Sequence, residues 1–131
     1  MKKLTLILSL IFTVTLSSPS YAEWTKVGEN VYGKTFYVDF EGIRKDGGYV
    51  YFWYLINTLK PDKWGDFSSK TYSQGKCDLF QYKWLDKSYH TQPMGEGTPS
   101  TTGVSEQAAK KLRYPPPNSV METVLKKVCS R

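Results

Sequence analysis

Residues 49–59 have the sequence YVYFWYLINTL, the densest run of β-branched and aromatic side chains after the N-terminal segment. Such side chains favour a strand over a helix. In an extended chain, alternate residues point to opposite faces, and here both faces are apolar. One face holds Val50, Phe52, Tyr54 and Ile56, and the other holds Tyr49, Tyr51, Trp53 and Leu55. This pattern is typical of a central strand that is covered on both sides of its sheet.

Shorter strand candidates flank this run. The turn signal Asp46-Gly47-Gly48 precedes it, and Lys60-Pro61 begins a loop after it. We expect further strands at residues 23–27, 35–40, 67–73, 79–85 and 88–91, with a turn at 86–87 between the last two. Strands at this spacing, joined by short turns, predict an antiparallel meander.

The C-terminal residues 119–129 predict an amphipathic helix. Ser119 can cap its N-terminus, and Glu122 follows at the spacing of a capping box. One apolar stripe contains Val120, Met121, Val124, Leu125, Val128 and Cys129. Such a stripe needs an apolar surface, and one face of the sheet is the only large one available, so we expect an α+β fold. A membrane surface is the alternative partner, although the stripe is short and lacks aromatic residues.

The first 22 residues have the pattern of a cleaved secretory signal. Lys2 and Lys3 precede an apolar stretch at 4–16, and Ser20 and Ala22 offer small residues at the −3 and −1 positions, so we expect cleavage after Ala22. An N-terminal anchor is the alternative, but about 13 apolar residues fall short of the roughly 20 that span a bilayer. No cysteine stands near the cleavage point for lipid attachment at a lipobox, and no later segment is apolar enough to cross a membrane. We therefore expect a periplasmic or secreted protein.

Residues 23–131 are then expected to form a single domain. The whole chain of 131 residues has a formal charge of +6, and loss of two lysines with the signal leaves +4. In an exported protein, this basic balance suggests anionic proteins, glycans or lipid headgroups as partners rather than nucleic acid. Residues 92–117 are expected to form a long exposed loop, with a helical turn or two at 106–112, and a Pro-rich connector.

Cys77 and Cys129 are the only cysteines, too few for a disulfide-dense scaffold or a four-cysteine zinc site. Export into an oxidising compartment makes a disulfide between them the expected state. A redox-active pair is the alternative, but the sequence has no Cys-x-x-Cys motif.

Three residues are candidates for catalysis. His90 could act as a general base, and Asp39 and Glu41 could be the paired acids of a glycan-cleaving enzyme. However, His90 is the only histidine and no nucleophile-elbow serine accompanies it, while Asp39 could simply cap the turn before Ile43. The sequence has no metal-ligand spacing, phosphate loop or nucleotide fingerprint, so we expect no metal, no cofactor and no enzymatic activity.

Aromatic residues exceed what one small core can use. They include Tyr49, Tyr51, Trp53, Trp64, Tyr82, Trp84 and Tyr89. Aromatic side chains beside lysines are typical of binding or self-association surfaces, although they could also line a half-buried second face of the sheet. As candidate binding residues we select Trp53, Tyr82, Lys83 and Trp84.

Several short segments together resemble a known family. They are WTKV at 24–27, FYVD at 36–39, DGG at 46–48, VYFWYL at 50–55, KC at 76–77, PMGEG at 93–97 and PPNSV at 116–120. In order and spacing, the chain resembles the surface-adhesin protein E family. The resemblance implies a twisted antiparallel sheet of about six strands, with a C-terminal helix held on its concave face by the disulfide Cys77–Cys129. The family's named member binds host matrix and serum proteins and can pair as a dimer, so the resemblance also implies a homodimer.

We therefore expect an exported, non-enzymatic binding module for proteins or glycans at the cell envelope. One alternative is a small envelope enzyme that acts on glycans through Asp39, Glu41 or His90. Another is a structural subunit that associates with itself through sheet edges.

Overall fold

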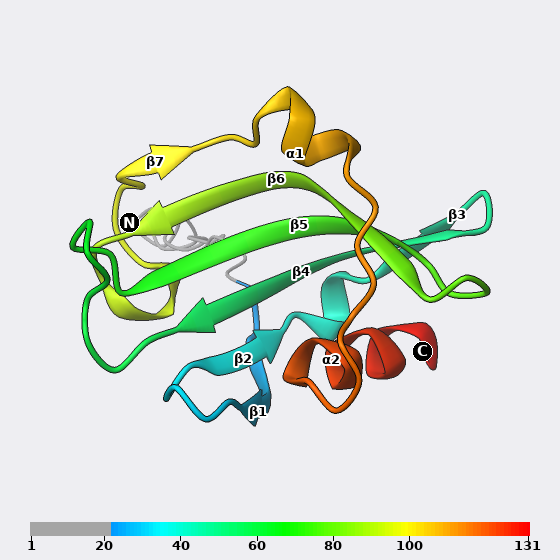
Figure 1. Ribbon diagram of the computed structural model, residues 1–131, viewed down its shortest axis with the longest axis horizontal. Coiled ribbons are helices and arrows are strands. Elements are labelled where there is room, and N and C mark those ends of the chain that lie inside the picture. The colour runs from blue at the N-terminus through cyan, green and yellow to red at the C-terminus, as the bar shows by residue number, and fades with distance from the viewer. Residues whose placement is uncertain (1–21) are drawn as a thin grey trace, which may run out of the picture.

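The computed structural model describes residues 22–131, so the predicted signal peptide lies outside the described residues except for Ala22. The chain forms an antiparallel sheet of seven strands (Figure 1). Six of them follow the order β1-β2-β4-β5-β6-β7, and β3 pairs with the first residues of β4, whereas β2 pairs with its last residues. The strands are β1 (Thr25–Glu29), β2 (Thr35–Val38), β3 (Arg44–Asp46), β4 (Tyr49–Asn57), β5 (Ser68–Lys76), β6 (Gln81–His90) and β7 (Thr101–Thr102). The predicted antiparallel sheet and its central strand at 49–59 are therefore confirmed.

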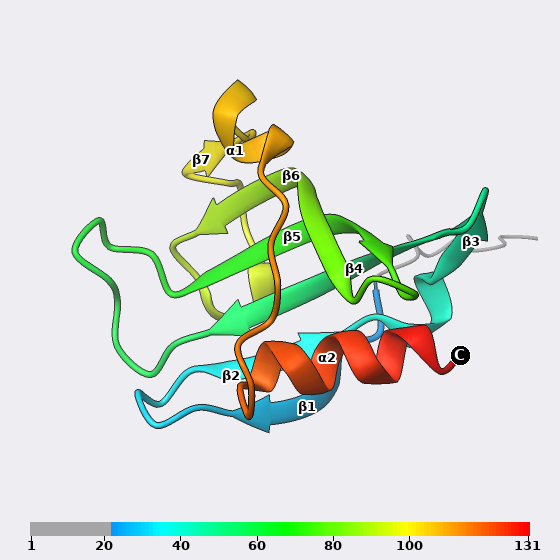
Figure 2. The same cartoon turned by 45° about the vertical axis from the view of Figure 1, so that its right-hand side comes forward.

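One face of the sheet, which we call the helix face, packs against α2 (Val120–Cys129), as Figure 2 shows. The helix contributes Met121, Val124, Leu125 and Val128, and the sheet contributes Phe36, Val38, Val50, Phe52, Tyr54 and Tyr82. Close approach depends on Gly75, because a Cβ there would lie only 3.2 Å from Leu125 Cδ1. The predicted helix and its packing on the sheet are both confirmed.

A disulfide joins Cys77, just after β5, to Cys129, the last residue of α2, with their Cα atoms 5.7 Å apart. The predicted pairing is confirmed. The bond fixes the end of the helix over the sheet and spans a sequence separation of 52 residues.

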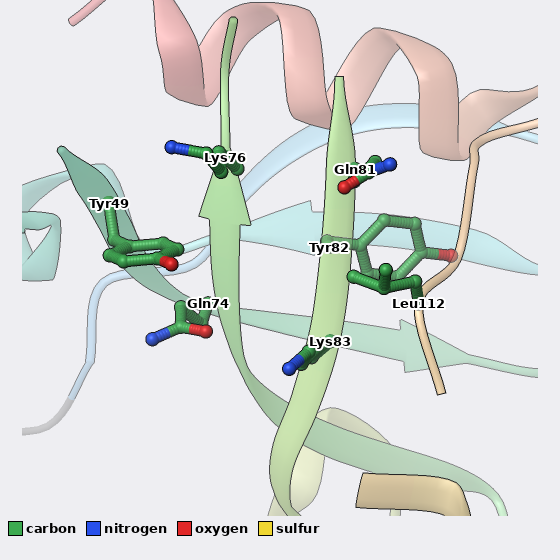
Figure 3. A pocket seen from close by; sticks show the side chains of 7 residues that line it. All are labelled: Tyr49, Gln74, Lys76, Gln81, Tyr82, Lys83 and Leu112. Carbon is green, nitrogen blue, oxygen red and sulfur yellow. The ribbon is translucent and has the colours of Figure 1, made fainter. Parts of the chain in front are cut away.

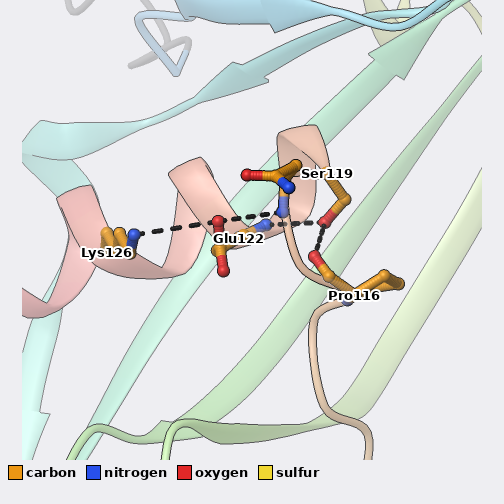
Figure 4. Close-up of polar contacts among 5 residues, drawn as sticks. Pro116, Ser119, Glu122 and Lys126 are labelled. Atoms are coloured by element: carbon orange, nitrogen blue, oxygen red, sulfur yellow. Dashed lines mark hydrogen bonds and ion pairs between the residues drawn. The ribbon is translucent and has the colours of Figure 1, made fainter.

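The N-terminus of α2 is capped by three linked hydrogen bonds (Figure 4). Ser119 Oγ accepts from the backbone N–H of Glu122 at 3.1 Å and donates to the Pro116 carbonyl at 2.7 Å. The Glu122 carboxylate accepts from the backbone N–H of Asn118 at 3.1 Å, one residue earlier than in a standard capping box. The reason is that the Ser119 N–H is already donated to the Pro116 carbonyl.

Replacing Ser119 by alanine should lower the free energy of unfolding by about 1 kcal/mol, because one N-terminal N–H of α2 loses its acceptor. Urea denaturation measures the change. Ser105→Ala is the matched control, since Ser105 caps the short helix α1 (Glu106–Lys110) through the same contact, to the N–H of Ala108. The α1 helix buries no residue, so this control should cost less; an equal or larger cost would contradict the assignment.

Strand β6 departs from the prediction of two strands with a turn at residues 86–87, which is wrong. It is one strand of 10 residues with a β-bulge. Tyr72 pairs with Asp86 and the next residue, Ser73, pairs with Trp84, so Leu85 has no partner on β5. The extra residue interrupts the alternation of faces, which places Trp84 and Lys87 on the same side of the sheet.

Residues 92–113 form more structure than the predicted exposed loop. The 3-10 turn η3 (Pro93–Gly95) packs on the side of the sheet opposite α2, where the backbone N–H of Gly95 donates to Ser68 Oγ at 2.8 Å. Gly95 is buried with φ +67°, and a Cβ there would lie 2.8 Å from the Lys70 side chain, which explains the glycine. Farther on, β7 pairs with the end of β6.

The Pro-rich connector crosses the helix face between α1 and α2 (Figure 1). Arg113 forms a two-way backbone bridge with Tyr82, and Pro115 is buried. The connector therefore covers part of the sheet that α2 does not reach. No helix within residues 22–131 combines the length and the apolar character needed to span a bilayer.

Candidate binding surface

The side of the sheet opposite α2, which we call the outer face, carries an aromatic ladder. We define this ladder as Tyr49, Tyr51 and Trp53 of β4 with Tyr72 of β5. Trp53 lies directly opposite Tyr72 in the register of the two strands, with the ring centroids 5.0 Å apart, and the centroids of Tyr51 and Tyr72 lie 6.2 Å apart. Tyr49 is 37% exposed and the other three are half-buried. The central strand was expected to be covered on both sides, but only Leu55, under η3, is fully buried on this side.

Cations and an amide fix the ladder in place. The Arg44 guanidinium lies 4.4 Å from the centroid of the Tyr51 ring, and its Nη2 lies 3.4 Å from the Tyr72 hydroxyl. Lys76 Nζ lies 5.0 Å from the centroid of the Tyr49 ring, and the Gln74 amide donates to the Tyr51 hydroxyl at 2.9 Å. The surface thus presents flat rings whose positions are held by contacts rather than free to rotate.

A shallow hollow of about 220 Å³ lies at one end of the ladder (Figure 3). It is lined by Tyr49, Gln74, Lys76, Gln81, Tyr82, Lys83 and Leu112. Figure 3 shows Gln74 and Lys83 projecting from neighbouring strands beside Tyr49, whereas Tyr82 and Leu112 lie together on the far side of β6. The polar side chains of this hollow, Gln74, Lys76 and Lys83, therefore extend the surface of the aromatic ladder from β5 onto β6.

A second hollow of about 680 Å³ brings together the two predicted acids, Asp39 and Glu41, with Trp24, Trp53 and Lys70. The Asp39 carboxylate also accepts from the backbone N–H of Gly42 at 3.2 Å, which is the turn-capping role expected for it. Glu41 is exposed and Asp39 is half-buried. Two carboxylates beside two indole rings can hold a sugar or a basic side chain.

His90 does not belong to this hollow. Its side chain is buried, with Nε2 2.8 Å from Ser88 Oγ and Nδ1 3.2 Å from the Gly97 carbonyl oxygen. Burial, with a smaller effect from the charge of Lys70, lowers the pKa of His90 below its usual value. His90 therefore holds the loop after β6 and has no access to a substrate beside Asp39.

The family model of the surface-adhesin protein E matches residues 24–130. The chain belongs to this family. The fold is similar to solved structures of Haemophilus influenzae protein E. Crystal form II gives a TM-score of 0.61 at 17% identity over 90% of this chain and 97% of that one. The structure from a non-typeable strain gives 0.56 at 17% identity over 89% and 83%. At this identity the likeness shows the shared fold, and a search of curated proteins finds no match.

Membership of a surface-adhesin family makes this an exported or surface protein, and the predicted resemblance is confirmed. The four candidate binding residues of this adhesin-family member do not share one surface. Trp53 and Lys83 lie on the outer face, whereas Tyr82 is buried in the core of the helix face. Trp84 also lies on the helix face, where its indole N–H donates to the Tyr54 hydroxyl at 3.1 Å. Burial is the main reason that the pKa of Tyr54 is raised.

The outer face of this adhesin-family member also contains Tyr72, Arg44 and Lys76, which were not predicted from the sequence. The sequence pattern could have identified Tyr72 and Lys76 as one face of a strand, because residues 70, 72, 74 and 76 are Lys, Tyr, Gln and Lys and alternate with small residues. Within residues 22–131, no group of three His, Cys, Asp or Glu side chains is placed to hold a metal ion.

Proposed function

We propose that the chain is an exported, non-enzymatic binding module that holds a protein ligand against the aromatic ladder of its outer face. The observation that carries this proposal is the uncovered second apolar face of the central strand. Three of the ladder residues are half-buried and the fourth is more exposed, although each carries a large apolar ring. Contiguous apolar surface of this kind marks interaction sites in soluble proteins.

The composition of the outer face supports a protein ligand. Tyrosine, tryptophan and arginine are the residue types that dominate binding energy at protein interfaces, and here they lie in contact with one another. Lys70, Lys76 and Lys83 add positive charge to the same face. A partner with an acidic surface would complement the end of this face at Lys76 and Lys83, whereas Asp39 and Glu41 lie beside Trp53 in the other hollow. Family membership agrees with such a role, because the family is one of surface adhesins.

The double variant Trp53→Ala/Tyr72→Ala should reduce binding of the purified protein to cultured epithelial cells by at least about tenfold, because it removes the centre of the ladder. Flow cytometry with fluorescently labelled protein measures the binding. Trp64→Ala is the matched control, since Trp64 is 74% exposed in the loop after β4 and lies outside the ladder. Equal losses in both variants would contradict the proposal.

A charge variant separates binding from folding. Lys83→Glu should also weaken cell binding without lowering the melting temperature, and Lys127→Glu on the exposed side of α2 is its control. Sedimentation velocity on the same variants tests self-association. If the ladder variants abolish a dimer and leave cell binding unchanged, the outer face is a homodimer interface and the structural-subunit alternative replaces the proposal.

The shared hollow of Asp39 and Glu41 favours one second candidate, a glycan-acting enzyme. It is the weaker candidate because Glu41 is exposed and Asp39 caps a turn, so neither has the apolar enclosure typical of a catalytic acid. Release of reducing ends from cell-wall glycan, lost in Glu41→Gln, would establish this activity. No release from any envelope glycan would leave the binding role.

We further propose that the signal is cleaved after Ala22 and that residues 23–131 act in the periplasm or outside the cell. Mass spectrometry of the protein recovered from envelope and culture fractions tests both points. An intact N-terminus in the membrane fraction would contradict them.

A further inference from the structure

The helix face has a hollow of about 530 Å³ at the end of the sheet that α2 does not reach. Its walls come from the ends of β4, β5 and β6 and from the loops at 30–34 and 58–67, which project beyond α2 at the left of Figure 1. The lining residues central to the argument are Tyr32, Lys34, Ile56, Lys60, Lys87 and Tyr89. We call this site the lysine hollow.

Lys87 is the central cation of the lysine hollow. The bulge at Leu85 turns it to the helix face, where its Nζ lies 4.0 Å from the Trp84 ring centroid and 5.2 Å from that of Tyr89. The side chain is half-buried. Within residues 22–131, neither Lys87 nor Lys34 forms an ion pair with a carboxylate. Burial of a cation without an anionic partner costs free energy, so an anionic ligand beside Lys87 would stabilise the charged side chain.

Two carboxylates that line the lysine hollow already have hydrogen-bond partners. Asp66 is buried and accepts from Ser100 Oγ at 2.6 Å. Asp62 Oδ1 accepts from the backbone N–H groups of Trp64 and Asp66 at 2.8 and 2.9 Å. These contacts hold the 58–67 loop in shape. Within residues 22–131, neither carboxylate forms an ion pair with Lys87, Lys34 or Lys60, so these three ammonium groups remain available to a ligand.

The surroundings of Lys87 already disfavour its charge. Burial, followed by the positive charges of Arg113 and Lys34, lowers the pKa of Lys87 to about 8. The other titratable groups that line this space are Tyr32, Lys60, Asp62, Asp66 and Tyr89, and burial is the main reason that the pKa of Tyr89 is raised. An anion bound beside Lys87 would offset both the desolvation and the repulsion.

We propose that the lysine hollow binds an acidic sugar, a pyranose that carries a carboxylate or sulfate group. The anionic group would pair with Lys87 and Lys34, while the C–H face of the ring would pack on Tyr89 or Tyr32. Thr58, Ser69 and the two carboxylates supply donors and acceptors for sugar hydroxyls. An acyl chain would instead lie against these polar groups, so the lining favours a sugar over a lipid. The volume suits a disaccharide.

Isothermal titration calorimetry of the mature protein with a fully sulfated heparin disaccharide tests this inference. Lys87→Gln and Lys34→Gln should each weaken binding by about tenfold, because each removes a charged contact. Lys127→Gln is the matched control, as an exposed lysine on the outer side of α2. Binding by the unmodified protein should weaken from pH 7 to pH 9 as Lys87 loses its proton, and this decrease should vanish in Lys87→Gln.

Two outcomes of these titrations would contradict the proposal. Binding that Lys127→Gln weakens as much as Lys87→Gln would show only general charge attraction. No binding of the disaccharide, together with Lys87-dependent binding to phosphatidylglycerol vesicles, would assign the hollow to a lipid headgroup. Because Lys34 is exposed, its variant keeps the test valid if Lys87→Gln alters folding. The proposal does not depend on the outer face, so the ladder variants should bind the disaccharide normally.

Discussion

The double variant Cys77→Ser/Cys129→Ser is expected to lose about 4 kcal/mol of unfolding free energy relative to the oxidised protein. The reason is that the disulfide closes a loop with a sequence separation of 52, which removes many conformations from the unfolded chain. Such a loss is a large fraction of the roughly 5–15 kcal/mol by which a domain is usually stable. Urea denaturation without reductant measures the difference.

The same protein supplies the control for the disulfide prediction. The unmodified chain treated with a thiol reductant should fall to the stability of the double variant, while the double variant should not respond to reductant. An unchanged denaturation midpoint in the variant would contradict a stabilising role for the bond. In that case, apolar packing of α2 alone would hold the helix on the sheet.

Phe52→Ala should cost about 3–5 kcal/mol, the usual range for loss of a buried aromatic side chain. Phe52 is fully buried at the centre of β4, in the cluster that includes Val124 and Leu125 of α2. Gly75 lies across from Val50 on the next strand and leaves no side chain to refill the space. The free energy of unfolding from urea denaturation checks the result.

Tyr51→Ala is the matched control for Phe52→Ala, because Tyr51 is the preceding residue on the same strand but faces the outer side. It should cost clearly less, since its ring is only half-buried. Equal costs for the two variants would mean that the outer face is as important for stability as the core. The aromatic ladder would then be a second core rather than a binding surface.

The elements with the strongest periodicity were predictable from sequence. The alternation in residues 49–59 and the stripe in 119–129 each identify a buried face, and both faces meet in the observed core. The turn expected at residues 86–87 does not exist, because Asp and Lys there lie in a strand whose backbone is held by β5. Local turn preference is weaker than a ladder of hydrogen bonds to a neighbouring strand.

The candidate site was only partly predictable. Tyr82, Lys83 and Trp84 are consecutive, so alternation in a strand already excludes all three from one face. The outer face depends on Tyr72, which stands in a strand that is otherwise polar and gains its role only from pairing opposite Trp53. That pairing is set by register between strands, which no single segment of sequence specifies.

Leu85 is one extra residue in β6, between Trp84 and Asp86, and it has no partner on β5. If Leu85 instead paired with β5 in a regular strand, strict alternation would exchange the sides of all later positions in the strand. Lys87 and Tyr89 would then leave the helix face, and the side chains of Ser88 and His90 would turn away from the loop they now hold. The bulge, rather than the identity of Leu85, therefore sets the sides of Lys87 and Tyr89, and deletion of the Leu85 codon should keep both on the helix face because Asp86 would then follow Trp84 opposite Tyr72.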